Sequence, residues 1–149
     1  MSGRPRNKNG AGAGTKQRPA RAGISLTHAR KMLPLVTRIV EELQNRWNRL
    51  SELEAEQGDL DRRRRGLDWP ERSRRYQITE EIAAEQRGLQ EAVAELEQLE
   101  LVLVDAIQGE VAFPTSINGR KAYYLWRAGE PDVKTWCYAH DPVRHPVKN

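Results

Sequence analysis

Apolar residues recur every three or four positions between residues 26 and 57, which is the spacing of one face of an α-helix. This stripe consists of Leu26, Ala29, Leu33, Val36, Ile39, Val40, Leu43, Trp47, Leu50 and Leu53. A second segment, over residues 70–107, repeats the rhythm in Ile82, Leu89, Val93, Leu96, Leu99 and Leu103. Because a lone amphipathic helix is unstable in water, we expect the two helices to pack as a long antiparallel hairpin.

Local signals mark the ends of both predicted helices. Gly58 is a suitable stop for the first helix, and Pro34 predicts a kink inside it. Asp68 followed by Glu71 predicts a capping box where the second helix begins. The segment 58–69 between the helices is expected to form an arginine-rich tip.

The period of the apolar residues changes beyond Gly109 from that of a helix to that of a strand. Asn118-Gly119 is a strong signal for a two-residue hairpin turn. We therefore expect a three-stranded antiparallel β-meander over residues 110–138 and a loose C-terminus over residues 139–149. The predicted fold class is α+β, with a long, coiled-coil-like helical hairpin followed by this small meander.

Charge is distributed unevenly along the chain. The formal net charge is +4, yet residues 1–23 carry six basic residues and no acidic one: Arg4, Arg6, Lys8, Lys16, Arg18 and Arg21. This segment has no large apolar residue after Met1, so we expect a disordered basic tail. The rest of the chain, residues 24–149, is expected to form a single domain and carries 19 basic and 21 acidic residues.

The tail and the tip are two basic regions that suit a phosphate backbone. The tip contains four consecutive arginines: Arg62, Arg63, Arg64 and Arg65. Lys and Arg attract nucleic acid whatever its sequence, so one alternative function is a nucleic-acid or ribosome-associated factor with weak binding through the tail. The acidic balance of the folded body, and the position of the two regions at opposite ends of the hairpin, favour solvated charges instead.

Composition also bears on the compartment. The single cysteine, Cys137, allows no internal disulfide framework, which fits a reducing cytoplasm. No run of 18 apolar residues is present, so we expect neither a membrane-spanning helix nor a membrane partner.

Two blocks of residues resemble a bacterial family, the domain of unknown function 2203. These are Ile24-Ser25-Leu26 with Ala29 and Leu33-Pro34-Leu35-Val36, and then Gly109, Val111, Phe113-Pro114, Gly119-Arg120, Tyr124-Leu125-Trp126-Arg127, Gly129-Glu130-Pro131 and Trp136. The resemblance covers residues 24–138, and the string Trp-Arg-x-Gly-Glu-Pro is its most specific part. It implies a small cytoplasmic protein without an established reaction. The family commonly has a histidine where this chain has Cys137.

The meander carries the candidate binding residues. Tyr124, Trp126, Arg127, Glu130 and Trp136 fall on two neighbouring strands and the turn between them. One interpretation is a pocket with indole walls in which Arg127 holds an anion. The other is a structural Arg127–Glu130 pair that clamps the turn. Strand alternation favours the clamp, because it places Arg127 and Trp126 on opposite faces of the sheet.

A second alternative is a metal-binding protein or an enzyme with a site around Glu130, Cys137 and His140. The Cys-x-x-His pair can supply two zinc ligands, although a closed zinc site needs four. The same pair is also conceivable as a thiol nucleophile with its base, but no orienting group accompanies it. No cofactor is predicted.

These patterns favour a non-enzymatic binding or interaction protein that uses the hairpin and the meander. Apolar residues beside the hairpin seam, Met32, Leu35 and Leu101, remain to be covered. We therefore expect a protein partner or self-association as a dimer.

Overall fold

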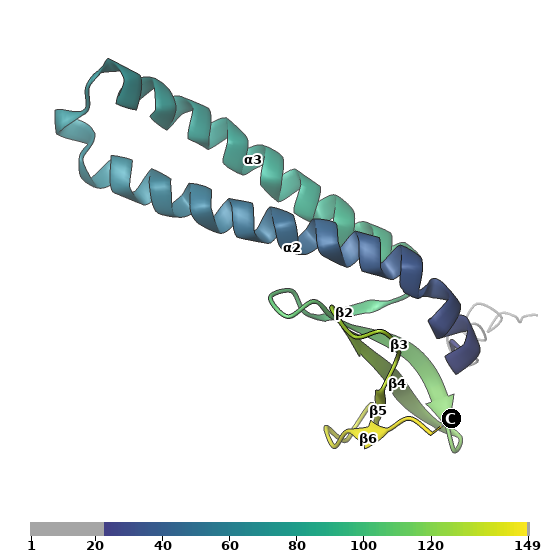
Figure 1. Ribbon diagram of the computed structural model, residues 1–149. Coiled ribbons are helices and arrows are strands. Elements are labelled where there is room, and N and C mark those ends of the chain that lie inside the picture. Colours follow the sequence, from purple (N-terminus) through teal and green to yellow (C-terminus); the bar gives the residue numbers. More distant parts are fainter. Residues whose placement is uncertain (1–22, 149) are drawn as a thin grey trace, which may run out of the picture.

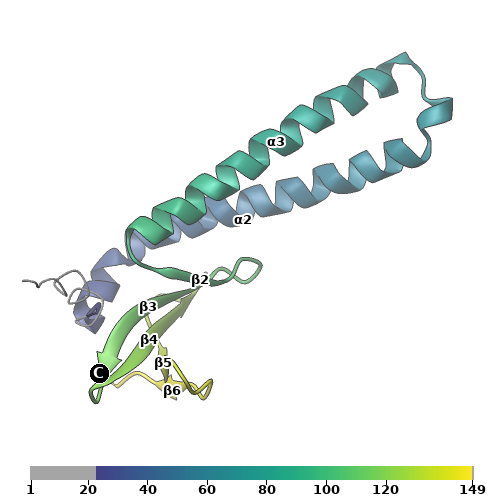
Figure 2. The same cartoon turned by 180° about the vertical axis from the view of Figure 1, so that it is seen from behind.

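The computed structural model describes residues 23–148, in which two long helices form a hairpin and five strands form one sheet (Figure 1). Helix α2 (Leu26–Arg62) and helix α3 (Trp69–Gln98) are joined through the short 3-10 helix η2 (Arg64–Gly66). The sheet lies at the base of the hairpin, and the tip projects away from it in both views (Figures 1 and 2). The predicted α+β hairpin and antiparallel sheet are confirmed, and the sheet has five strands instead of three. Apart from Gly23, the predicted basic tail lies outside the described residues.

Helix α2 begins with a side-chain cap at Ser25. The Ser25 hydroxyl accepts a hydrogen bond from the His28 N–H at 3.0 Å, which satisfies one of the donors at the helix start. The helix passes through Pro34 without a break, and its ribbon changes direction in the N-terminal, purple part (Figure 1). Nine apolar side chains of the helix are buried: Ala29, Leu33, Val36, Ile39, Val40, Leu43, Leu50, Leu53 and Leu60.

The tip is shorter than predicted, because it has a small core of its own. This distal cluster consists of four buried residues: Leu53, Leu60, Leu67 and Ile78. Burial of Leu60 extends α2 to Arg62, so the predicted helix end at residue 57 is wrong and Gly58 is an interior helical residue. The predicted tip over residues 58–69 contracts to residues 63–68.

Helix α3 starts with the predicted capping box. The Glu71 N–H donates to Asp68 Oδ1 at 2.9 Å, and the Asp68 N–H donates to Glu71 Oε1 at 3.2 Å. These reciprocal bonds satisfy two backbone donors where the helix begins. They also fix the direction in which α3 leaves the tip.

The predicted end of the second helix at residue 107 is wrong, because α3 ends at Gln98. Glu100 adopts a left-handed conformation, with φ of 65°, and turns the chain toward the sheet. Leu101 is buried in the cluster of apolar residues shared by α2, α3 and the sheet, which includes Val36, Leu96 and Phe113 and which we call the base core. Strand β2 (Val102–Asp105) then pairs with the next strand. The helical spacing of Leu103 is overridden by sheet pairing, since tertiary contacts outweigh local propensity.

The five strands are antiparallel and follow each other across the sheet in chain order. After β2 come β3 (Glu110–Ile117), β4 (Arg120–Arg127), β5 (Thr135–Tyr138) and β6 (His145–Pro146). The predicted hairpin turn between β3 and β4 is confirmed: Asn118 and Gly119 have φ of 55° and 76°.

The sequence predicts a loose C-terminus over residues 139–149, but the described part of this segment adds a fifth strand to the sheet. Strand β6 pairs with β5, and the Val147 N–H donates to the Lys134 carbonyl at 2.8 Å. Short strands carry almost no sequence pattern, and β6 contains a proline. That proline stands at the far edge of the sheet, where a missing N–H breaks no ladder.

Cross-strand register defines two faces of the sheet. Residues directly opposite each other lie on the same face, so Phe113, Tyr124, Trp136 and His145 form one row. Because Phe113 is buried in the core shared with α2, we call this the inner face. The outer face carries another set: Glu110, Ala112, Tyr123, Leu125, Arg127 and Cys137.

Charged side chains cover the outside of the hairpin. Arg46 bonds Glu42 at 3.0 Å and Glu85 at 3.2 Å, and its guanidinium lies directly over Gly88. That close approach explains a glycine in the middle of α3, since a Cβ there would overlap the guanidinium. In the described chain, no helix combines the length and the apolar composition that crossing a membrane requires.

Candidate ligand-binding site

The five predicted binding residues do not form one pocket. Trp126 is 2% exposed and belongs to the base core. Arg127 lies on the outer face, as the strand alternation predicted, and Glu130 lies in the turn after β4. Tyr124 and Trp136 are direct cross-strand neighbours on the inner face. The predicted set therefore divides into a structural turn and an aromatic site.

The string Trp-Arg-x-Gly-Glu-Pro folds into a turn that bonds to itself. The Trp126 indole N–H donates to the Glu130 carbonyl at 2.9 Å, and the Glu130 N–H donates to the Arg127 carbonyl at 3.0 Å. Gly129 supplies the left-handed conformation, with φ of 97°. The Glu130 carboxylate accepts from the Arg127 backbone N–H at 2.9 Å. The clamp between Glu130 and Arg127 thus acts through the Arg127 backbone, whereas the Arg127 guanidinium lies near Glu110.

A buried carboxylate on the outer face holds that guanidinium and the C-terminal segment together. Glu110 is 5% exposed. Its carboxylate accepts hydrogen bonds from both terminal nitrogens of Arg144, one of them at 3.1 Å, and lies 3.8 Å from the Arg127 guanidinium. These bonds raise the pKa of Arg144. The segment before β6 is thereby fixed to β3.

Two hydrogen bonds hold the N-terminal end of α2 beside the sheet, one from Ile24 just before the helix and one from Arg30 to the connection between β4 and β5. The Ile24 N–H donates to the Pro114 carbonyl at 2.7 Å, on the part of β3 that β2 does not cover. Arg30 Nε donates to Asp132 Oδ1 at 3.0 Å, and this guanidinium holds the pKa of Asp132 below its usual range. Both bonds fix the first turns of α2 beside the inner face.

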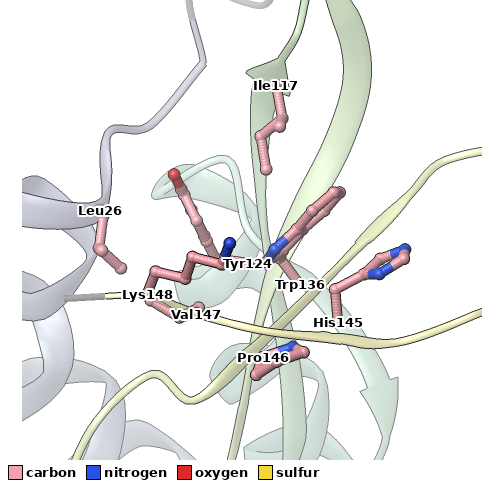
Figure 3. Close-up of a pocket in the computed structure, with 8 residues that line it drawn as sticks. All are labelled: Leu26, Ile117, Tyr124, Trp136, His145, Pro146, Val147 and Lys148. Atoms are coloured by element: carbon pink, nitrogen blue, oxygen red, sulfur yellow. The ribbon is translucent and has the colours of Figure 1, made fainter.

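A cavity of about 430 Å³ lies between the first turn of α2 and the inner face (Figure 3). Eight residues line it: Leu26, Ile117, Tyr124, Trp136, His145, Pro146, Val147 and Lys148. Four elements supply these residues, namely α2, β3, β4 and β5, together with the C-terminal segment that begins with β6. The cavity exists because the C-terminal segment returns to pair with β5.

The aromatic side chains of the cavity support one another. Trp136 and His145 are stacked, with ring centroids 4.4 Å apart and an interplanar angle of 27°. Tyr138 packs edge-on against Trp136 at 4.9 Å, and the Arg120 guanidinium lies over the Tyr138 ring at 4.1 Å. Asn118 Nδ2 donates to the Tyr138 hydroxyl at 2.9 Å. These contacts hold the indole of Trp136 in place as a rigid wall.

The cavity combines apolar walls with a few polar groups at its opening. The rings of Tyr124 and Trp136 face the space between β3 and the C-terminal segment, and the side chain of Lys148 extends across its front (Figure 3). Such a space suits a flat apolar group, and the ammonium of Lys148 suits an anion attached to it.

The sequence does not place His145 or Lys148 in a binding pocket, because it predicts a loose C-terminus over residues 139–149. The only available signal is the alternation of His145 with Val147, which is too short to indicate a strand.

The proposed metal ligands do not gather into a site. In residues 23–148, no group of three or more His, Cys, Asp or Glu side chains is placed to hold a metal ion. Cys137 lies on the outer face, where burial raises the pKa of its thiol. Glu110 and Asp141 raise this pKa further, and Arg144 lowers it. His140 and Glu130 lie in the turns that follow β5 and β4.

The four arginines of the tip differ in their surroundings. Arg63 bonds Asp59 at 3.0 Å and Glu71 at 2.8 Å, and Arg62 lies 3.6 Å from Asp59. For Arg64 and Arg65, the described chain contains no ion-pair partner within 4.0 Å. The other predicted nucleic-acid contacts, in the basic tail, lie outside the described residues.

Comparison with known proteins identifies a family for this chain. Residues 24–145 match a family described as an uncharacterised conserved protein, DUF2203. No curated protein and no solved structure matches the chain. The matched residues include the turn at Glu130 and most of the cavity wall.

Proposed function

The chain belongs to the family of domain of unknown function 2203, which comes without an assigned activity, and we propose that it is a binding protein. In this proposal, the cavity between Tyr124, Trp136 and His145 takes an apolar group that carries an anion. The single observation that supports it is the Trp136–His145 stack, which lines an open cavity instead of filling a core.

The dimensions of the cavity support this proposal. Small-molecule sites have volumes of roughly 300–1,000 Å³, are mostly apolar and contain few polar groups. The cavity of about 430 Å³ falls in that range, and its volume is sufficient for one bicyclic ring system with an attached carboxylate. Two sources share this chemistry: a free aromatic carboxylate, and the C-terminal residue of a partner protein whose last side chain is aromatic.

Binding fits the residues better than catalysis does. A thiol nucleophile needs a neighbouring base and a lowered pKa. Cys137 and His145 lie on opposite faces of the sheet, and the pKa of the thiol is raised. The single cysteine also favours a reducing compartment, so a cytoplasmic location is part of the proposal.

Calorimetric titration with 2-naphthoate tests the proposal, with 2-naphthamide as the uncharged analogue. At about 0.3–0.4 kcal/mol per heavy atom, 2-naphthoate is expected to bind with a Kd of roughly 0.1–1 mM. Trp136→Ala should weaken binding about fivefold or more, and Lys148→Gln about two- to fivefold. Lys121→Gln makes the same change of charge on the outer face and should have no effect.

Two further arms complete the design. A short peptide ending in a phenylalanine carboxylate, compared with its C-terminal amide, distinguishes a partner's C-terminus from a free carboxylate. His145→Ala provides a second cavity variant if Trp136→Ala does not fold. Absence of binding to both carboxylate probes, or equal binding by the wild type and both cavity variants, would contradict the proposal.

We also propose that two copies associate through the base of the hairpin. An apolar groove of about 420 Å³ lies there, lined by Leu43, Trp47, Leu89, Gln90, Val93, Glu97, Leu103 and Ala106. Trp47 is 38% exposed in this groove. The groove borders β2, an edge strand whose Val102 and Val104 are also exposed. Leu101 was expected to be uncovered beside the hairpin seam, but it is buried in the base core and is not available to a second copy.

A further inference from the structure

The tip of the hairpin carries a second surface, separate from the cavity and at the opposite end of the molecule (Figures 1 and 2). We define the tip surface by five exposed residues of η2 and of the start of α3: Arg64, Arg65, Trp69, Arg72 and Tyr76. Three of them are cationic and two are aromatic. The distal cluster beneath them leaves their side chains in solvent.

The charges of the tip surface are not neutralised by the hairpin. The neighbouring arginines are engaged: Arg63 with Asp59 and Glu71, Arg74 with Glu56 and Glu81, and Arg75 with Asp61. Among the described residues, no carboxylate lies within 4.0 Å of Arg64, Arg65 or Arg72. Arg72 donates instead to the Leu67 carbonyl at 2.8 Å. Three positive charges are therefore available to an anion.

Two aromatic side chains stand beside these charges. Trp69 is 70% exposed and Tyr76 is 80% exposed, although large aromatic side chains are mostly buried in folded proteins. They are seven residues apart on α3, which is about two turns or ~10.5 Å along one side of the helix. Arg72 lies between them, three residues after Trp69 and four before Tyr76, so the three side chains share that side.

The framework under the surface is rigid. Leu67 is 6% exposed and anchors the connection between η2 and α3 in the distal cluster. The capping box of Asp68 and Glu71 fixes the first turn of α3. A hollow of about 650 Å³ beside this connection is lined only by residues 61–66, which are charged apart from Gly66. Such a charged lining suits a phosphate group better than an apolar side chain of a partner protein.

From this arrangement we propose that the tip surface binds single-stranded nucleic acid, in addition to the ligand taken by the cavity. Arg64, Arg65 and Arg72 contact phosphates, and unpaired bases stack on Trp69 and Tyr76. A duplex offers no free base faces for these rings. Glu80 is exposed four residues after Tyr76 on the same side of α3, and its negative charge limits the contact to the tip.

Fluorescence anisotropy of the full chain with a labelled oligouridine tests this proposal. Trp69→Ala with Tyr76→Ala should weaken binding by at least about 25-fold, because each of the two stacked bases contributes at least about fivefold. Arg64→Gln with Arg65→Gln should lower the slope of log K against log salt by about 1.4, at ~0.7 per phosphate contact on a single strand. The matched control is Arg38→Gln with Arg87→Gln, which removes the same charge from exposed positions nearer the base.

Three further probes separate this ligand from other polyanions: an abasic oligomer of equal length, an oligouridine–oligoadenosine duplex, and a polyglutamate peptide. The aromatic double variant should weaken binding of oligouridine alone. Equal losses in the tip variants and in the matched control would overturn the proposal, because only net charge would then matter. Equal aromatic dependence with polyglutamate would also overturn it, in favour of an acidic protein partner.

Discussion

Replacing Arg144 by alanine is predicted to destabilise the whole sheet, although this arginine is 44% exposed and lies in a segment without a recognisable pattern. Its guanidinium donates two hydrogen bonds to Glu110, whose side chain is only 6% exposed. The substitution removes both bonds and leaves a nearly buried carboxylate. Arg127, at 3.8 Å, remains as its nearest cation.

The magnitude follows from burial and from the remaining partner. Breaking a fully buried ion pair costs about 3–5 kcal/mol, whereas an exposed pair contributes about 0–1 kcal/mol. This pair has one buried and one half-exposed member, and Arg127 compensates in part, so we expect a loss of about 2 kcal/mol. For a domain of this size, that loss lowers Tm by roughly 6–10 °C.

Thermal and urea unfolding of four variants measures this loss. Arg144→Ala and Glu110→Gln are compared singly and together, and Arg38→Ala is the control at an exposed arginine. The double variant should be less destabilised than the sum of the single variants, because the two residues interact directly. If Arg144→Ala unfolds within about 0.5 kcal/mol of the wild type, as ordinary surface substitutions do, the Glu110 contact does not hold the C-terminal segment.

Three other predictions concern the hairpin and its junction with the sheet. Gly88→Ala should not stabilise the wild type in urea unfolding, because the new methyl group displaces the Arg46 guanidinium. In an Arg46→Ala background, the same substitution should raise the free energy of unfolding by about 1 kcal/mol, because alanine favours the helix more than glycine does. The pKa of Asp132 is lower in the folded chain than its usual value of about 4, so its ion pair stabilises the fold above about pH 4, and this stabilisation is lost as the pH falls through the folded-state pKa. Arg30→Gln should therefore flatten the pH dependence of the free energy of unfolding below about pH 4, and an unchanged pH profile would contradict this. Light scattering of the full chain should give twice the 17.1 kDa of one chain, and Trp47→Glu should give a single chain; a wild type that stays at 17.1 kDa at high micromolar concentration would exclude the dimer.

The parts of the fold that could be predicted are those with a repeated or local signal. The apolar stripe of α2 extends over many turns, so its helical period is unmistakable. The capping box at Asp68 and the turn at Asn118-Gly119 are local devices that act through neighbouring residues alone. Strand alternation likewise placed Arg127 and Trp126 on opposite faces of the sheet, because the two-residue period of a strand does not depend on the strand that pairs with it.

The parts that were missed depend on contacts between distant residues. Leu103 continues the helical spacing of α3, yet the chain leaves the helix before it, because pairing with Val111 in β3 gains more than another helical turn. Strand β6 is defined by its partner and by the Arg144–Glu110 bond, neither of which leaves a periodic pattern. The C-terminal segment that begins with this strand supplies four of the eight residues that line the cavity, so sequence analysis placed Tyr124 and Trp136 in a binding site but not His145.

The most direct test of the cavity is a titration of 2-naphthoate followed through the indole N–H signals of a nitrogen-15 spectrum. The chain has four tryptophans, and each reports on a different place: Trp47 on the apolar groove, Trp69 on the tip, Trp126 on the turn at Glu130, and Trp136 on the cavity. We predict that the Trp136 signal, assigned with Trp136→Phe, shifts saturably while the Trp126 and Trp69 signals stay in place. A titration that leaves Trp136 unmoved, or that moves Trp47 instead, would contradict a ligand site at this cavity.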